Sequence, residues 1–145
     1  TLRVVGIDPW APSLSIGRER VAQAGLATRI ALREQAGEDL PDIEAFDLAW
    51  IPSAFIPQHA LPRIVERARR ALRPGGWLLF AMLNEGGDPL AASLTRLRAT
   101  LWGGLLAAPR EVEALLASAG LSGVVTLPGP PSSVIVMVAG RRPAR

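Results

Sequence analysis

The stretch LRVVGID, residues 2–8, decides the fold, because it is a short, mostly apolar run that ends on a single carboxylate. Such a run, rich in β-branched residues and followed at once by Pro9, is typical of a strand buried on both faces of a parallel sheet. Its acid, Asp8, then lies at the carboxyl edge of the sheet, where open α/β folds bind their ligands. There Asp8 could accept hydrogen bonds from the two hydroxyls of a nucleoside ribose. The alternative is an ordinary solvated acid at the end of a strand.

The length and composition are those of one globular domain with a real hydrophobic core. The chain has 145 residues, of which 49% are apolar, and a domain of that size can bury a core without metals or disulfides. No apolar run approaches the roughly 20 residues that a membrane-spanning helix needs, so we expect no contact with a membrane. The sequence opens inside a strand, without a leader or an initiator Met. We therefore expect that upstream sequence has been removed and that residues 1–145 form a single domain.

The charge pattern argues against a polyanionic partner. All 16 basic residues are arginine and the net charge is only +3, so the sequence pI of about 11.2 reflects the absence of lysine and tyrosine. The arginines are spread among acids without forming a basic stripe, and we expect no nucleic-acid binding. The chain has no cysteine, which excludes disulfides and thiolate metal sites and fits a cytoplasmic protein. No spacing of His, Asp and Glu indicates a metal site.

After the first strand, the chain alternates between helical and strand patterns. Helices are expected over residues 12–26, 58–72, 89–102 and 109–119, and further strands over residues 27–32, 46–51, 77–83, 121–127 and 133–139. The first helix would turn Ile16, Val21 and Ala22 inward. A tight turn would occupy residues 73–76. Strands that alternate with helices across short loops predict βαβ units, and hence an α/β fold with a mostly parallel sheet and right-handed crossovers.

The last two strands should pair differently from the others. Only a short, Pro-rich segment separates residues 121–127 from residues 133–139. Because this segment is too short for a helical crossover, the two strands should pair antiparallel. The sequence thus predicts a doubly wound, mostly parallel sheet that closes on a C-terminal antiparallel strand pair.

This order of elements resembles the class I S-adenosylmethionine-dependent methyltransferases, from their second strand to their last. The likeness is carried by residues 4–8, by residues 38–41 followed by 46–50, by residues 71–80 and by residues 109–121. The resemblance implies a Rossmann-like fold, S-adenosylmethionine as cofactor, and an enzyme that transfers a methyl group to a small-molecule acceptor. It also implies that the carboxylate of Asp8 holds the ribose hydroxyls of the cofactor.

One part of the family's pattern is missing. Its first strand, and the Gly-rich loop that holds the methionine end of the cofactor, have no counterpart in the sequence. The glycines at residues 75–76 lie at the wrong end of a strand to replace that loop. In the family's strand order the missing strand is central, between the strands expected at residues 2–8 and 46–51, and its absence leaves backbone groups unpaired. We therefore expect the isolated chain to be an N-terminally truncated domain that binds cofactor poorly.

The resemblance implies cofactor contacts beyond Asp8. Pro9 and Trp10 follow that acid, and the indole of Trp10 could stack on the adenine; packing against the next helix is the alternative. In the adenine loop the family often has an acid where this chain has Ala36. The contact to the adenine amino group would then fall to Glu38 or to the backbone of Gly37.

The segment after the strand at residues 46–51 is expected to border the methyl-donating sulfonium. Ile51 and Pro52 would form part of the cofactor site there, with Ser53 beside them. The segment lacks the Asn or Asp, followed by Pro-Pro-aromatic, that marks the amino-methylating members, so we expect transfer to oxygen or carbon. His59 is the only histidine and could take the acceptor's proton in an O-methyl transfer. A surface or capping role is the alternative.

Two other functions stay open at this point. A nicotinamide-dependent oxidoreductase of the doubly wound class also has an acid after its second strand, although the closing antiparallel pair argues against it. The other alternative is a non-catalytic, methyltransferase-like scaffold, which Ala36 and the missing Gly-rich loop favour. The sequence does not fix the oligomeric state, and a homodimer is one of the options.

Overall fold

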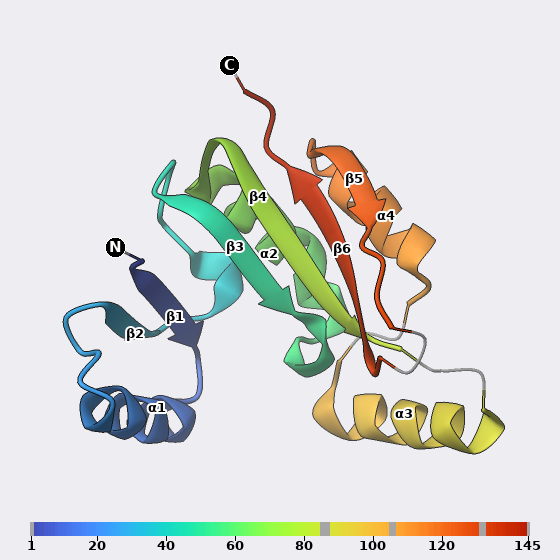
Figure 1. The fold of residues 1–145 in the computed structure, drawn as a ribbon, viewed down its shortest axis with the longest axis horizontal. Helices are drawn as coiled ribbons and strands as arrows, with labels where there is room; N and C mark the ends of the chain where they lie inside the picture. Colours follow the sequence, from blue (N-terminus) through green and yellow to red (C-terminus); the bar gives the residue numbers. More distant parts are fainter. Residues whose placement is uncertain (1, 85–87, 105–106, 131–132, 145) are drawn as a thin grey trace. The chain divides into compact units, whose positions relative to one another are not determined.

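The computed structural model describes residues 2–84, 88–104, 107–130 and 133–144 (Figure 1). The chain divides into two compact units, Thr1–Leu40 and Pro41–Arg145, each with its own sheet. The single domain expected from the sequence stays a prediction. No helix within the described ranges combines the length and the apolar character needed to cross a bilayer.

The first unit is a strand–helix–strand motif. It consists of β1 (Val4–Asp8), α1 (Ala11–Gln23), β2 (Ile30–Glu34) and a short 3-10 helix, η1 (Gly37–Asp39). The two strands are parallel, and β1 ends on Asp8 as the sequence predicts. The second strand begins at Ile30 rather than at residue 27. The reason is a turn, closed by the N–H groups of Arg29 and Ile30, which both donate to the carbonyl oxygen of Leu26.

The inward face of α1 differs from the predicted one. Leu14 is only 4% exposed, whereas Ile16 is 53% exposed. Ala22 is exposed as well, so that Val21 is the one predicted residue that is partly buried. Gly17 explains the difference, because a β-carbon at this position would lie 2.9 Å from a leucine side chain of β2. The helix packs against β2 through the side that carries Leu14 and Gly17, and Ile16 is exposed to solvent.

The second unit is built on a four-stranded sheet (Figure 1). Its strands are β3 (Phe46–Pro52), β4 (Leu72–Leu83), β5 (Ser122–Thr126) and β6 (Ile135–Arg141), in the order β3-β4-β6-β5. Strands β3 and β4 are parallel, while β6 runs antiparallel to both of its neighbours. The predicted antiparallel pair at the C-terminal end of the sheet is confirmed.

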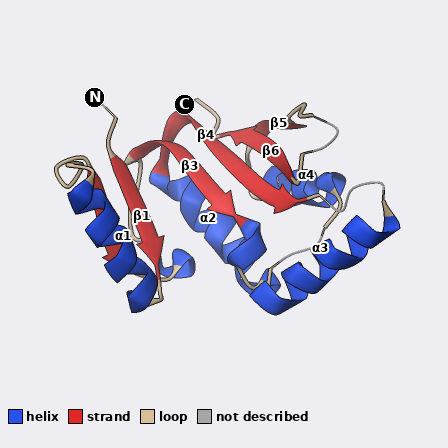
Figure 2. Cartoon of the chain, turned by 60° about the horizontal axis from the view of Figure 1, so that its bottom comes forward, coloured by secondary structure: helices blue, strands red, loops and turns tan. Residues whose placement is uncertain are grey.

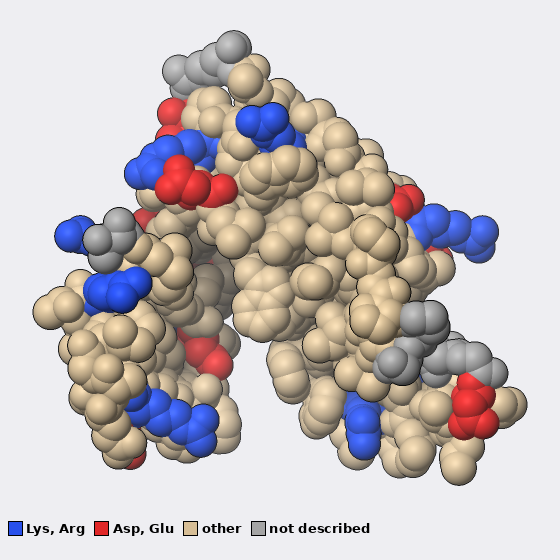
Figure 3. All heavy atoms as spheres, viewed as in Figure 1, with Lys and Arg blue, Asp and Glu red and all other residues tan. Residues whose placement is uncertain are grey.

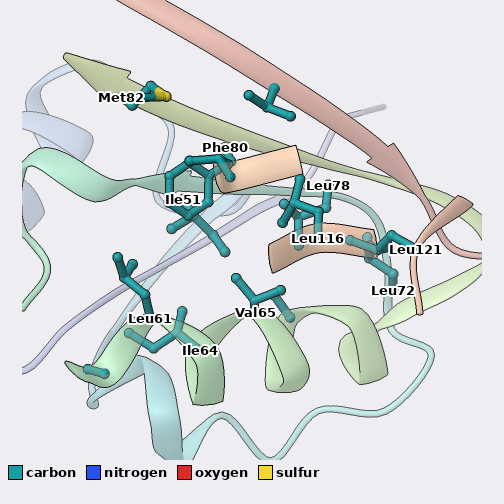
Figure 4. Close-up of a cluster of buried hydrophobic side chains, with 14 residues drawn as sticks. Ile51, Leu61, Ile64, Val65, Leu72, Leu78, Phe80, Met82, Leu116 and Leu121 are labelled. Atoms are coloured by element: carbon teal, nitrogen blue, oxygen red, sulfur yellow. The ribbon is translucent and has the colours of Figure 1, made fainter. Parts of the chain in front are cut away.

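Among its described residues this unit has three α-helices, and two of them cover one face of the sheet. They are α2 (Leu61–Ala71), α3 (Pro89–Trp102) and α4 (Pro109–Ser118), with the short 3-10 helices η2 (Ser53–Phe55) and η3 (Gln58–Ala60) between β3 and α2. Figure 2 shows α2 and α4 on the same side of the strands. The core lies between these layers, where Leu61 and Val65 of α2 face Phe80 of β4 (Figure 4).

The opposite face of the four-stranded sheet is apolar and exposed. Trp50 is 62% exposed, Leu48 54% and Trp77 42%, and exposed apolar residues of β5 and β6 continue this face. In Figure 3 it forms an area without charged side chains, with acids and arginines at its margins. The burial on both faces expected for residues 2–8 is likewise not met, since Val4 is 42% exposed and the other residues of β1 are only partly buried. Apolar strand sequence predicts burial but does not supply the element that covers the strand.

The turn expected at residues 73–76 is built into β4 instead. The strand starts at Leu72, opposite Phe46, but the next paired residues are Leu48 and Trp77. Residues 73–76 therefore bulge out of the ladder, and Gly75 adopts a φ of +81° within the bulge. The bulge is held by the end of β6 and the residue after it: Nε of Arg141 donates to the carbonyl oxygen of Gly75 at 2.9 Å, and the N–H of Gly75 donates to the carbonyl oxygen of Arg142 at 2.9 Å.

Four strands pair on one edge only within the described residues. Strands β1 and β2 pair with each other alone, β3 pairs with β4 alone, and β5 pairs with β6 alone. Each of them keeps a row of backbone donors and acceptors available for a further strand.

Candidate functional site

The carboxylate of Asp8 is held in place by the backbone that follows it. Its Oδ1 accepts a hydrogen bond from the N–H of Trp10 at 2.8 Å, which fixes the turn between β1 and α1. Asp8 is half-buried, and a carboxylate has about four lone-pair sites on its two oxygens. One hydrogen bond therefore leaves the carboxylate able to accept further donors. Pro9 and Trp10 are exposed next to it, and the Trp10 side chain is 65% exposed.

The predicted adenine loop lies at the same edge of the first unit as Asp8. Gln35 makes the connection, since its N–H donates to the carbonyl oxygen of Asp8 at 3.1 Å. Its side-chain Nε2 donates to the carbonyl oxygen of Asp39 at 2.8 Å, which fastens η1. Gly37 and Glu38, at the start of η1, are half-buried beside this connection. The structure thus brings Asp8 and the predicted adenine loop together.

Gln35 is a positioning residue that the sequence analysis missed. It directly follows Glu34, which is in register with Asp8 across the parallel pair. The available signal was an amide side chain one position beyond a strand end, because its NH2 group can donate to backbone carbonyls of the following turn. To infer from this signal that Gln35 lies beside Asp8, one needs the register of β1 against β2, which the sequence alone does not give.

The predicted residues Ile51 and Pro52 lie in the second unit, at the end of β3. Ile51 is 4% exposed and belongs to the hydrophobic core, so only its backbone can contact a ligand. Pro52 is half-buried and ends the strand. Ser53 is fully buried, and its hydroxyl donates to the carbonyl oxygen of Ala81 at 3.0 Å. This bond ties the end of β3 to β4 and fixes the backbone at Pro52.

A hollow of about 320 Å³ opens at the carboxyl end of β4. Its walls are the end of β4, the start of β6 and the start of α4 with the two residues before it, and they are mostly apolar. One amide lies among them, Asn84, whose Nδ2 donates to the carbonyl oxygen of Ser133 at 3.0 Å. A small, partly apolar group is the kind of ligand that suits such a wall.

His59 lies in η3, where its side chain is exposed. The structure therefore places it in the second unit, on the segment that enters α2, and its predicted catalytic role stays a prediction. Within the described ranges, no cluster of three or more His, Asp or Glu side chains is arranged to hold a metal ion.

The chain is similar in structure to several solved methyltransferases. One is the S-adenosylmethionine-dependent methyltransferase SibL in its apo form (TM-score 0.82, 22% identity, 98% of this chain and 44% of that one). Another is an O-methyltransferase family protein from Burkholderia thailandensis (TM-score 0.75, 14% identity, 99% and 51%). A third is Haemonchus contortus phosphoethanolamine N-methyltransferase 2, solved with S-adenosyl-L-methionine (TM-score 0.76, 15% identity, 98% and 44%). The chain spans about half the length of these proteins.

At such identities the likeness shows the fold, and it confirms the Rossmann-like α/β class expected from the sequence. No curated protein matches the sequence. The family described as "Methyltransferase domain" matches residues 1–76, which is just over half of the 145 residues and includes β1, the adenine loop and the bulge of β4. This chain therefore belongs to the methyltransferase domain family.

Proposed function

We propose that the protein transfers a methyl group from S-adenosylmethionine to oxygen or carbon of a small-molecule acceptor. The observation that carries this proposal is the half-buried carboxylate of Asp8, fixed by the N–H of Trp10 and joined through Gln35 to the adenine loop. The match to the methyltransferase domain family over residues 1–76 supports it.

The groups at this edge fit the nucleoside part of the cofactor. Two vicinal ribose hydroxyls need hydrogen-bond acceptors, and the carboxylate of Asp8 supplies them. Within the described structure, its Oδ2 accepts no hydrogen bond that would compete with the ribose. The exposed Trp10 ring offers an apolar face to a purine, and Gly37 and Glu38 would meet the adenine edge. In the second unit, Pro52 and the backbone of Ile51 would border the sulfonium end. When bound, the cofactor supplies a methyl group already activated for displacement.

The residues of this chain would then act mainly by positioning. An in-line displacement needs the acceptor held close to the methyl group and water kept out, and this needs no triad or metal. We place part of the acceptor in the hollow at the end of β4, since its apolar wall and single amide suit a small, partly apolar molecule. His59 would take the acceptor's proton when the acceptor is a hydroxyl.

The choice of oxygen or carbon rests on the sequence. The similar structures include both an O-methyltransferase family protein and an N-methyltransferase, so they do not select the acceptor atom. The residues at the end of β3, Ile51-Pro52-Ser53, lack the Asn or Asp and the Pro-Pro-aromatic sequence of the amino-methylating members.

Calorimetric titration of S-adenosylhomocysteine tests the proposal. It should be carried out on this chain and on the product of the complete gene, with Asp8→Asn and Glu34→Gln as variants. The Asn side chain still accepts from Trp10, so the turn persists while the charge is lost. Hydrogen bonds to a charged group are worth about 1.5–3 kcal/mol, so Asp8→Asn should weaken binding about 10- to 100-fold.

Glu34→Gln is the matched control, because Glu34 is the exposed acid paired with Asp8 across the sheet. This variant should change the affinity for S-adenosylhomocysteine by no more than about twofold from that of the unaltered protein. Binding to neither protein would overturn the proposal in favour of the scaffold alternative. Binding of NADH, with none of S-adenosylhomocysteine, would favour the oxidoreductase.

The role of His59 needs its own measurement. His59→Asn should lower kcat about 100-fold or more and remove the acidic limb of the pH–rate profile, since general-base catalysis typically contributes that much. Gln58→Ala, in the same 3-10 helix, is the control and should leave kcat and the pH–rate profile unchanged. An unchanged pH profile in His59→Asn would contradict the proton-accepting role of His59.

A further inference from the structure

Helix α3 packs through one face of small residues. Ala99 is 1% exposed, and Ala92 and Thr95 are partly buried on the same side. The C-terminal end of the helix is fastened by Gly104, where a β-carbon would lie 2.1 Å from the carbonyl oxygen of Ala54 in η2. The helix is therefore held against its own unit by this narrow face.

The other side of α3 carries four leucines that remain in solvent. Their exposed fractions are 68% for Leu90, 47% for Leu94, 56% for Leu97 and 74% for Leu101. The spacings between them are four, three and four residues, which is the seam of a helix that packs lengthwise against another helix. Ala92 and Ala99 lie seven residues apart on the opposite side, so the seam points away from the unit. We call Leu90, Leu94, Leu97 and Leu101 the leucine seam.

We propose that the leucine seam binds the leucine seam of a second copy of this chain, with the two α3 helices antiparallel. The spacing of the seam reads the same in both directions along the helix. A two-fold axis midway between Leu94 and Leu97 therefore sets Leu94 against the partner's Leu97, and Leu90 against the partner's Leu101. A two-fold interface requires a surface that complements itself in this way.

The residues beside the seam suit the antiparallel arrangement. Ser93 and Thr100 border it on one side, and Ala91 and Arg98 on the other. The two-fold axis brings matching sides of the two helices together, so Arg98 lies beside the small side chain of the partner's Ala91, and Thr100 lies beside the partner's Ser93. Antiparallel helices also align their macrodipoles favourably.

The size of the surface indicates a dimer that depends on concentration. A helix of 14 residues is about 21 Å long, and one of its faces is roughly 10 Å wide. Trp102 and Phe55 extend the surface at one end, where their rings lie 5.1 Å apart and remain 45% and 63% exposed. Leucines flanked by large aromatic side chains make an effective interface core, but one helix face of this size is smaller than the standard interface of about 800 Å² per partner. We expect a weak dimer rather than an obligate one.

Cysteine cross-linking tests both the contact and its direction. The chain has no cysteine, so each introduced one is unique. Leu90→Cys and Leu101→Cys chains, mixed and oxidised, should form a disulfide-linked dimer. Leu90→Cys alone should not, because antiparallel helices hold the two copies of residue 90 about 16 Å apart, beyond the ~7 Å limit between α-carbons. If Leu90→Cys alone formed as much disulfide-linked dimer as the mixture, the antiparallel arrangement would be overturned. If neither sample formed a disulfide-linked dimer, the contact itself would be overturned.

Sedimentation equilibrium tests the dimer itself. The unaltered chain should show a concentration-dependent rise in mass towards that of two copies. Leu94→Glu with Leu97→Glu should weaken association about 100-fold or more, since it buries like charges against each other. Ile16→Glu is the control, because Ile16 is a comparably exposed apolar residue on α1, and it should leave association unchanged.

Two outcomes would overturn the proposal. One is an unaltered chain that stays monomeric at every concentration. The other is a dimer of this chain that is absent from the product of the complete gene, which would mean that another segment of that polypeptide covers the leucine seam. Neither outcome depends on cofactor binding, so the dimer proposal can fail while the proposed function holds, and the reverse.

Discussion

The guanidinium of Arg142 lies 2.7 Å from the carboxylate of Glu44, although 98 positions separate the two residues in the chain. The side chains are only 17% and 30% exposed. The same guanidinium donates to the carbonyl oxygens of Arg69, Arg70 and Leu72, at the C-terminal end of α2. One cation thus joins the end of β6, the loop before β3 and the last turn of α2, and it satisfies carbonyls that a helix end leaves unpaired.

Arg142→Ala should therefore lower the free energy of unfolding by about 2–3 kcal/mol, because it removes a charged donor that Glu44 and several helix-end carbonyls share. Urea unfolding followed by circular dichroism measures the effect. Arg73→Ala is the matched control, since Arg73 forms an ion pair of 2.8 Å with Asp47 in which both side chains are largely exposed. That variant should cost no more than about 1 kcal/mol. Equal losses in the two variants would contradict the bridging role of Arg142.

A second carboxylate fastens α4 to the sheet. Oε1 of Glu113 accepts from the N–H of Thr126 at 3.0 Å and from its hydroxyl at 2.7 Å, and both residues are partly buried. Glu113→Ala removes both bonds and should cost about 1–3 kcal/mol, because it leaves a backbone donor of β5 unpaired. Thr126→Val removes only the hydroxyl and should cost about 1 kcal/mol or less. If thermal unfolding showed Thr126→Val to be more destabilising than Glu113→Ala, the bond from the N–H of Thr126 would not be the main interaction that holds α4 to the sheet.

The contact between Gly104 and η2 is the tightest backbone approach of any glycine in the described residues. A β-carbon at Gly104 would overlap the carbonyl oxygen of Ala54, and a backbone atom cannot move aside as a flexible side chain can. Gly104→Ala should thus destabilise the second unit by about 1–3 kcal/mol and loosen the C-terminal end of α3. Hydrogen exchange of the α3 amides measures the loosening. Gly129→Ala, where no atom lies within 4 Å of the added carbon, should change neither stability nor exchange.

The sequence predicted the helices and strands well wherever one side of an element meets the core. The helix expected over residues 89–102 is α3 residue for residue, and Leu61, Ile64 and Val65 form the buried face of α2 as their spacing indicates. Asp8 ends β1 as expected. Such features depend on local periodicity and on where a buried strand must stop, and both are properties of neighbouring residues.

Features that depend on a distant partner were missed. The inward face of α1 was predicted at Ile16, Val21 and Ala22, but Gly17 permits the close approach and so determines which side packs. The turn at residues 73–76 became a bulge because β6, which is remote in sequence, holds Gly75. Gln35 was missed for the same reason, since its role follows from the register of β1 against β2.

The exposed face of the second sheet leads to a prediction from fluorescence. All four tryptophans of the chain are at least 42% exposed: Trp10, Trp50, Trp77 and Trp102. The emission of the isolated chain should therefore lie near that of indole in water and should be quenched readily by acrylamide. Trp50→Phe should remove the largest share of the quenchable signal from the second unit, because Trp50 is its most exposed tryptophan. Trp77→Phe is the control and should remove less, since the guanidinium of Arg141 lies 5.7 Å from its ring centre and shields that ring. A blue-shifted, poorly quenched emission at high dilution, where copies are apart, would mean that the chain itself covers the apolar face that the structure leaves open.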